Sequence, residues 1–192
     1  MKDRTREKIL TVASRLFGKY GFHKTTVDEI ARAAHKAKGS VYYYFKSKEE
    51  LFLAVVTQEI QVLKSGLTKV IVENQADATG LIKSYILKRM YLMKDAVNYH
   101  ESLKEGYNND FSFLDECRED FMRFEIDLMQ AVLERGIREQ KFQMKDTKAT
   151  AQVIILAMKA TEIPFYQYRK IAEFEHTIIE LIEILIRGLE KS

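Results

Sequence analysis

Apolar residues recur every three or four positions along most of the chain, which is the spacing of one face of an α-helix. The first such run is Ile9, Ala13, Leu16, Phe17 and Tyr20, and Gly21 follows it as a suitable helix stop. The 192 residues include one proline and eight glycines, so turn signals are sparse. The pattern predicts an all-α protein of about nine helices.

A second, short helix is predicted after Gly21, because Thr26 and Glu29 have the spacing of a capping box. Ile30, Ala31 and Ala34 then supply a small apolar face. Residues 35–37 read as a tight turn. This segment therefore predicts a helix that ends a few residues before Lys38.

A third helix is predicted from Lys38 to Tyr44, with Val41 and Phe45 four residues apart as its docking pair. Its other face carries lysine, hydroxyl and tyrosine side chains. Ser47 and Glu50 form another capping-box pattern, which predicts a new helix from about Lys48. Two short helices joined by a turn of three to four residues are typical of the helix-turn-helix unit.

The charge of the chain is concentrated in the same segment. Residues 1–50 hold twelve basic and six acidic residues, whereas the remainder holds nineteen basic and twenty-two acidic ones. The formal net charge of +3 therefore combines a basic head with a mildly acidic body. Positive charge on a helix-turn-helix is the electrostatic pattern expected of a DNA-binding protein.

Residues 9–21, 25–31 and 38–51 resemble the tetracycline-repressor (TetR) family of bacterial one-component regulators. The resemblance implies an all-helical protomer, a homodimer, and a repressor released from double-stranded operator DNA by a small-molecule effector. His35, Lys36 and Ala37 depart from it, because family members usually carry glycine, an apolar residue and serine there. Histidine tolerates a left-handed turn better than most residues.

The predicted DNA contacts fall into two groups. Lys38, Gly39 and Ser40 open the third helix, where side chains and bare backbone can reach base edges. By resemblance, phosphates are contacted by Thr26, Tyr42, Tyr43, Tyr44 and Lys48. Lys36 either extends to solvent or reaches a phosphate. Core packing is the alternative for the tyrosines.

The chain divides into a helix-turn-helix domain at 1–50 and a ligand-binding and dimerisation domain at 51–192. In the second domain the patterns predict helices at about 48–72, 81–97, 113–140, 147–168 and 173–189, with a short helix and loop within 98–112. Asn74 to Gly80 is the clearest break.

The last two helices carry broad apolar faces, wider than one packing stripe requires. This width suggests contact with both the home core and a second chain, and the family resemblance favours the same helices as the dimer interface. The predicted dimer contacts are Val153, Ile155, Ile178, Ile182 and Leu185. The alternative is that these are simply well-buried core helices.

The body is also rich in methionine and aromatic residues, a combination that suits an apolar ligand pocket. The candidate ligand contacts are Met90, Met93, Phe121, Phe124, Met158, Glu162 and Phe165. Ordinary core packing explains each one singly. We expect a largely hydrophobic effector, with Glu162 as a polar anchor or merely a surface acid.

Other classes of function have little support. The four histidines are scattered without metal-ligand spacing, and no nucleophile or phosphate-loop motif occurs, so neither an enzyme, a metal site nor a cofactor is predicted. The least poor catalytic candidate, His100 beside Glu101, reads more simply as a polar surface pair. The single cysteine and the lack of an apolar signal or membrane span indicate a cytoplasmic protein. The alternative function is a helical protein-interaction module without DNA binding.

Overall fold

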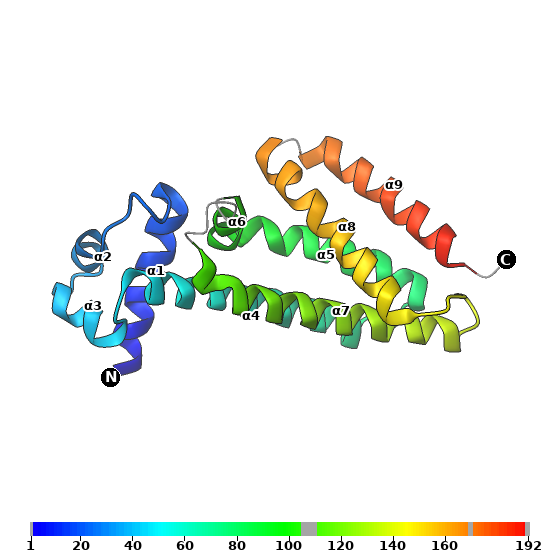
Figure 1. Cartoon of the computed structure of the whole chain (residues 1–192), viewed down its shortest axis with the longest axis horizontal. Helices are drawn as coiled ribbons and strands as arrows, with labels where there is room; N and C mark the ends of the chain where they lie inside the picture. Colours follow the sequence, from blue (N-terminus) through cyan, green and yellow to red (C-terminus); the bar gives the residue numbers. More distant parts are fainter. Residues whose placement is uncertain (1, 105–110, 169–170, 191–192) are drawn as a thin grey trace. The chain divides into compact units, whose positions relative to one another are not determined.

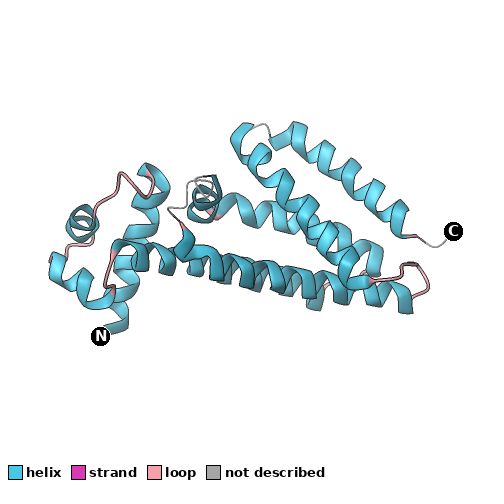
Figure 2. Cartoon of the chain, viewed as in Figure 1, coloured by secondary structure: helices cyan, strands magenta, loops and turns pink. Residues whose placement is uncertain are grey.

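The computed structural model describes residues 2–104, 111–168 and 171–190, with the side chains of 2, 3, 104 and 161–175 left out. These residues form helices in the predicted all-α pattern (Figures 1 and 2). The first four are α1 (Lys2–Tyr20), α2 (Val27–Ala33), α3 (Lys38–Tyr44) and α4 (Lys48–Glu73). They are followed by α5 (Ala78–Asp95), α6 (Val97–Lys104), α7 (Asp115–Arg138), α8 (Thr147–Tyr168) and α9 (Ile171–Leu189).

The chain forms two compact units, Met1–Val62 with Ala96–Cys117 and Leu63–Asp95 with Arg118–Ser192. We call the first the head and the second the body. The head therefore includes α6 as well as the helix-turn-helix. The functional limits of 1–50 and 51–192 remain a prediction, because a contact-based division does not assign function.

Helices α1, α2 and α3 pack on one another through the apolar positions that the sequence indicates. Ile9, Phe17, Ile30, Val41 and Phe45 are all buried. The expected docking pair of α3, Val41 and Phe45, is thus confirmed. Burying side chains of this size contributes roughly 1.5–3 kcal/mol each, so a few such contacts can hold the short α2 and α3 in place.

The turn between α2 and α3 is held by backbone hydrogen bonds around a left-handed residue. His35 has a φ of 55°, and its N–H donates to the Arg32 carbonyl at 3.1 Å. The Lys36 N–H donates to the Ala31 carbonyl at 2.9 Å. This pair of bonds is the Schellman ending, in which glycine usually takes the left-handed position.

Replacing His35 with glycine should raise the free energy of unfolding by about 1 kcal/mol. A residue with a side chain is destabilised by roughly 1–2 kcal/mol in the left-handed region. Glycine avoids this strain, but it loses more backbone entropy on folding, which offsets part of the gain. Urea denaturation measures the change. Ala33→Gly, in the last turn of α2, is the control and should destabilise the protein. A destabilised His35→Gly variant would contradict the assignment.

An aromatic cluster joins the loop after α1 to α4 and to the segment before α7, all within the head. The Phe22 ring lies 4.9 Å from that of Phe52 and 5.3 Å from that of Phe111, measured between centroids. Phe17 and Phe113 extend the cluster. Aromatic pairs at such distances stabilise beyond their buried area. The sequence gives no sign that Phe111 would pack on the head.

Helix α6 is fixed to α1 and α4 by one carboxylate and one amide. Glu59 of α4 accepts a 2.9 Å bond from the Tyr99 N–H in the first turn of α6, and a 2.7 Å bond from the Asn98 side chain. The same Asn98 amide donates to the Ser14 carbonyl of α1 at 3.2 Å. Burial raises the pKa of Glu59 despite these bonds. We call this arrangement the Glu59 clip.

The body helices begin and end close to the predicted limits, with one clear shift. Helix α5 begins at Ala78 rather than near Leu81, because Asp77 caps it through the Gly80 N–H at 2.8 Å. In addition, Glu139 accepts from the Ala78 N–H at 2.9 Å. The body core includes Leu63 and Leu67 from α4 and a buried row along α5 and α7.

The loop between α7 and α8 closes onto the end of α9. The Phe142 ring lies over Gly136, where a Cβ would fall only 1.9 Å from the ring. The Gln143 N–H donates to the Leu189 carbonyl at 3.0 Å. Position 136 thus requires glycine for space, and the carboxyl end of α9 is tied into the body.

Candidate nucleic-acid interface and body cluster

The outer face of α3 is open to solvent along its length. Tyr43 is 66% exposed and Tyr42 43% exposed. Lys38 and Gly39 are exposed and Ser40 is half-buried. A Cβ at Gly39 would meet no atom within 4 Å, so the backbone there is bare. Such a surface can approach a groove of DNA closely.

Thr26 sits at the amino-terminal cap of α2, as predicted. Its hydroxyl accepts from the Glu29 N–H at 3.3 Å, and Glu29 accepts from the Thr26 N–H at 2.8 Å. The capping box is therefore confirmed. The hydrogen bonds from Thr26 lower the pKa of Glu29. A phosphate reaching Thr26 would have to share these groups with that carboxylate.

Lys38, the first residue of α3, pairs with Asp28 of α2 at 2.9 Å. Both side chains are about half exposed, so the pair is weak and readily exchanged. The hydrogen bond and charge of Asp28 raise the pKa of Lys38. Asp28 thus lies beside Lys38 at the open face of α3, a contact that the sequence patterns did not single out.

Lys48 turns inward at the start of α4. Its ammonium donates to the Phe22 carbonyl at 3.1 Å and lies 4.2 Å from the centre of the Phe22 ring. An ammonium has three donors, so two remain for another acceptor. Lys36 and Tyr44 are half-buried. These three predicted contacts are therefore less open than those on the outer face of α3.

The capping pattern at the start of α4 is present in part. The Ser47 hydroxyl accepts from the Glu50 N–H at 3.1 Å. The Glu50 carboxylate, however, accepts from the Lys46 N–H at 2.6 Å rather than from the Ser47 N–H. At the start of α3, Ala37 offers no side-chain cap, as its methyl group requires.

The body contains a buried polar cluster that sequence reasoning missed. Arg89 of α5 is 3% exposed and Glu125 of α7 is fully buried. The guanidinium donates twice to the carboxylate, once at 3.0 Å from Nη2, and Tyr85 donates to the same carboxylate at 2.9 Å. Burial and the charge of Glu125 raise the pKa of Tyr85 well above its ordinary value. The contact joins residues 36 apart in sequence, so no local pattern signals it.

The predicted ligand contacts lie mostly on the same helices. Met93, Phe121 and Met158 are buried, whereas Met90 and Phe124 are half-buried. The Phe121 and Phe124 rings stack with their centres 6.4 Å apart. Met93 is one turn from Arg89, and Phe121 one turn from Glu125, so the apolar and polar groups share helix faces. The side chains of Glu162 and Phe165 lie outside the described residues.

The predicted dimer contacts divide between the interior and the surface. Ile155, Ile178 and Ile182 are buried within the protomer, Val153 is exposed and Leu185 is half-buried. Each helix also carries an apolar stripe whose residues are exposed or half-buried. On α8 it comprises Val153, Leu156, Ala157 and Ala160, and on α9 Leu181, Ile184, Leu185 and Gly188. Leu156 is 57% exposed and Ile184 65% exposed.

Neither a metal site nor a membrane span is found in the described part of the chain. No group of three histidine, cysteine or acidic side chains there is placed to hold a metal ion. No helix among those residues is long and apolar enough to cross a membrane. His100 is buried, with its ring centre 5.8 Å from that of Tyr99, so its expected position at the surface is wrong.

The family described as bacterial regulatory proteins, tetR family, matches residues 9–55, which span α1 to the first turns of α4. The HTH-type transcriptional regulator QacR of Staphylococcus aureus is 25% identical over 97% of this chain and 98% of its own. The chain belongs to the TetR family. The match to the TetR family covers the helix-turn-helix, whereas the sequence similarity to QacR also covers the body.

Solved structures show the same fold. The TetR-family chain aligns with a transcriptional regulator from Cytophaga hutchinsonii at a TM-score of 0.80, with 24% identity over 96% of this chain and 98% of that one. FadR from Bacillus subtilis, solved in complex with stearoyl-CoA, aligns at 0.78 with 18% identity, over 96% and 99% of the two chains. The family match over residues 9–55 and the likeness to QacR make the protein a helix-turn-helix transcriptional regulator of the TetR family, and these relatives are regulators rather than enzymes.

Proposed function

We propose that this protein is a cytoplasmic repressor that binds operator DNA as a homodimer and leaves it when a hydrophobic small molecule binds in the body. The open outer face of α3 carries this proposal, because a basic, hydroxyl-rich helix presented without obstruction is what a DNA groove requires. The residues 1–50 then act as the DNA-binding domain and 51–192 as the ligand-binding and dimerisation domain.

The proposed contacts follow from exposure. Lys38, Gly39 and Ser40 begin the helix and face base edges. Tyr42 and Tyr43, the most open tyrosines of α3, donate to phosphates, and Thr26 and Lys48 flank them. Tyr44 and Lys36 lie at the edges of this surface. Phosphate contacts fix position and affinity, whereas base contacts fix sequence choice.

Tyr42→Phe should weaken binding to every DNA sequence by about tenfold or more, because one hydrogen bond to a charged acceptor contributes about 1.5–3 kcal/mol. Lys38→Ala should weaken binding and also relax base preference. Operator fragments selected from genomic DNA by the wild-type protein provide the substrate. Fluorescence anisotropy at several salt concentrations measures the affinity, and repeat selection with the variant measures the preference.

Tyr20→Phe is the matched control, because Tyr20 is also half exposed but lies at the far end of α1. It should bind as the wild-type protein does. Equal affinity of Tyr42→Phe and wild type would contradict the phosphate assignment. If the wild-type protein selects no DNA at all, the alternative of a protein-interaction module is favoured over DNA binding.

A dimer is supported by the two apolar stripes of α8 and α9. The stripe residues fall three and four apart, so each forms one continuous helix face. The small residues Ala157, Ala160 and Gly188 allow a partner helix to approach closely. A twofold dimer also suits DNA binding, because two recognition helices can then read two half-sites one turn of DNA, about 34–36 Å, apart.

An effector in the body is supported by the mixture of groups on α5 and α7. Met93 and Phe121 offer adaptable apolar surface, while Arg89 and Glu125 are fixed polar groups one turn away. That a family relative, FadR, was solved with stearoyl-CoA agrees with a hydrophobic ligand. To lower operator affinity tenfold, the ligand must bind the two states with a difference of about 1.4 kcal/mol.

A further inference from the structure

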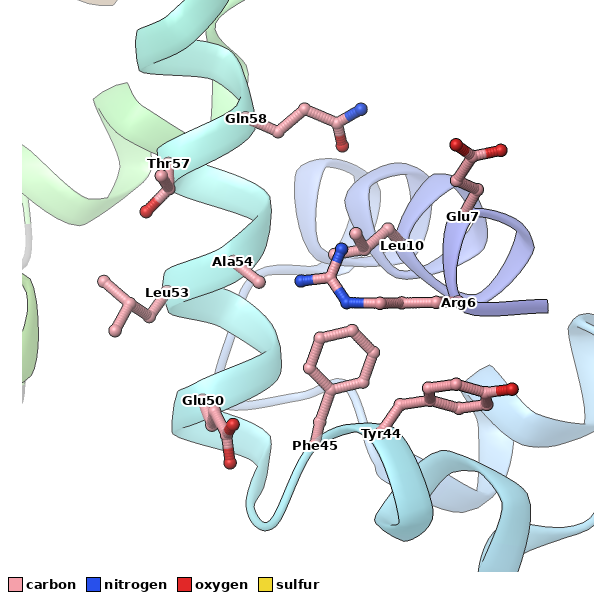
Figure 3. Close-up of a pocket in the computed structure, with 10 residues that line it drawn as sticks. All are labelled: Arg6, Glu7, Leu10, Tyr44, Phe45, Glu50, Leu53, Ala54, Thr57 and Gln58. Atoms are coloured by element: carbon pink, nitrogen blue, oxygen red, sulfur yellow. The ribbon is translucent and has the colours of Figure 1, made fainter. Parts of the chain in front are cut away.

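The head has a pocket of its own, between α1 and α4 and beside the last residue of α3 (Figure 3). Its volume is about 490 Å³. This falls within the range of about 300–1,000 Å³ that is usual for small-molecule sites. All of its lining residues belong to the head, so it is separate from the effector region proposed on α5 and α7.

The floor of this pocket is apolar. Leu10 of α1 and Phe45 are buried, and Leu53 and Ala54 of α4 are half-buried at its side. Thr57 and one glutamine continue the α4 wall with polar groups. A ligand would therefore place a flat or short hydrocarbon part on Phe45 and could hydrogen-bond further along α4.

The pocket is lined by one cation, Arg6, and by two carboxylates, Glu7 and Glu50. The Arg6 guanidinium lies 5.2 Å from the centre of the Phe45 ring and points between α1 and α4 (Figure 3). Among the described residues, no carboxylate lies within ion-pair distance of it. Glu50 is already bonded to the Lys46 N–H at 2.6 Å, and Glu7 points away from Phe45 (Figure 3).

We propose that this pocket binds a small organic carboxylate with an aromatic or short aliphatic body. Arg6 would pair with the carboxylate through two parallel hydrogen bonds, for which a guanidinium is well shaped. The hydrocarbon part would lie on Leu10, Phe45 and Ala54. A DNA phosphate is a poorer occupant, because it gains nothing from the apolar floor, whereas the hydrocarbon part of an organic carboxylate does.

The site would act on DNA binding directly. Tyr44 is both the last residue of α3 and part of the pocket wall. A ligand held against it therefore touches the recognition helix without any change in the body. This consequence rests on the proposed DNA interface, whereas binding of the carboxylate itself does not.

Methyl NMR of the full-length protein tests the proposal with 2-naphthoate as the probe and uncharged 2-naphthamide as its match. We expect 2-naphthoate to shift the methyl signals of Leu10, Leu53 and Ala54, and naphthamide to bind at least tenfold more weakly. Arg6→Gln should reduce naphthoate affinity about tenfold or more, the value of a charge-assisted pair. Arg4→Gln, an exposed arginine on the same helix outside the pocket, should leave it unchanged.

Ala54→Leu is the second variant, because it fills the pocket from a half-buried position and does not depend on Arg6. It should also abolish the shifts. The proposal is overturned if naphthoate shifts only body methyls, if naphthamide binds equally well, or if neither variant changes the affinity. It is also overturned if the probe does not bind and Arg6→Gln reduces the slope of log operator affinity against log salt concentration by about one. That result would make Arg6 a contact to a DNA phosphate. A wild-type protein that binds naphthoate but selects no DNA would contradict the proposed function alone.

Discussion

Replacing Ile184 with aspartate should convert the protein into a folded monomer with at least a hundredfold weaker hold on its operator. In a twofold dimer the change occurs twice, and each unpaired charge in a packed interface costs about 3–5 kcal/mol. Ile184 is largely exposed in the single chain, so the charge is harmless to the protomer. Light scattering gives the mass, and anisotropy with operator DNA gives the affinity.

Val72→Asp is the control, because Val72 is an even more exposed apolar residue on α4, outside both stripes. It should remain dimeric and bind DNA. Leu156→Asp on α8 should behave as Ile184→Asp does. Ile182→Asp is uninformative for assembly, since Ile182 is buried and the variant should unfold. A wild-type protein that is monomeric at micromolar concentration would remove the basis of this prediction.

Arg89→Leu should lower the free energy of unfolding by about 3–5 kcal/mol, because it leaves the Glu125 carboxylate buried with the Tyr85 hydroxyl as the donor that remains among the described residues. Removing both charges should cost far less, since a buried ion pair can be replaced by apolar groups of similar size. The double variant Arg89→Leu with Glu125→Leu is therefore expected to be more stable than Arg89→Leu alone. Urea denaturation of both variants measures the difference.

Lys83→Leu supplies the matched control on the same helix. Lys83 pairs with Glu183 at 3.3 Å, but both side chains are more than 40% exposed. Its loss should change stability by less than about 0.5 kcal/mol. If Arg89→Leu is as mild as Lys83→Leu, the buried pair is not the stabilising element that its burial implies.

The helix-turn-helix was predictable because its signals are local. The Thr26–Glu29 box, the Val41–Phe45 pair and the basic charge all act within a few residues of one another, and the structure confirms the first two. The left-handed turn was predictable in position but unusual in residue, since His35 occupies it without glycine. The limits of α8 agree with the spacing of its apolar positions and with the Asp146 cap.

The rest depended on contacts between distant parts of the sequence. Helical spacing indicates that Ile178 and Ile182 lie on an apolar helix face. It cannot show whether that face packs in the core of the same protomer or against a partner chain. The Arg89–Glu125 pair and the contact of Phe111 with Phe22 join segments that no sequence window contains. Helix α5 begins before the predicted Leu81 because Asp77 caps it through the Gly80 N–H, and the Asp-x-x-Gly spacing is the local signal of this start.

Glu59 makes the folding stability of the head depend on pH in the opposite direction to most carboxylates. The ordinary pKa of a glutamate side chain is 4.5, and burial raises the pKa of Glu59 in the folded head. Its contribution to folding is therefore greatest below pH 4.5 and is lost as the pH rises through the raised pKa. Lowering the pH through this range therefore strengthens the joint of α1, α4 and α6. Glu139, which follows α7 and accepts from the Ala78 N–H, has a lowered pKa and loses its contribution as acidity increases.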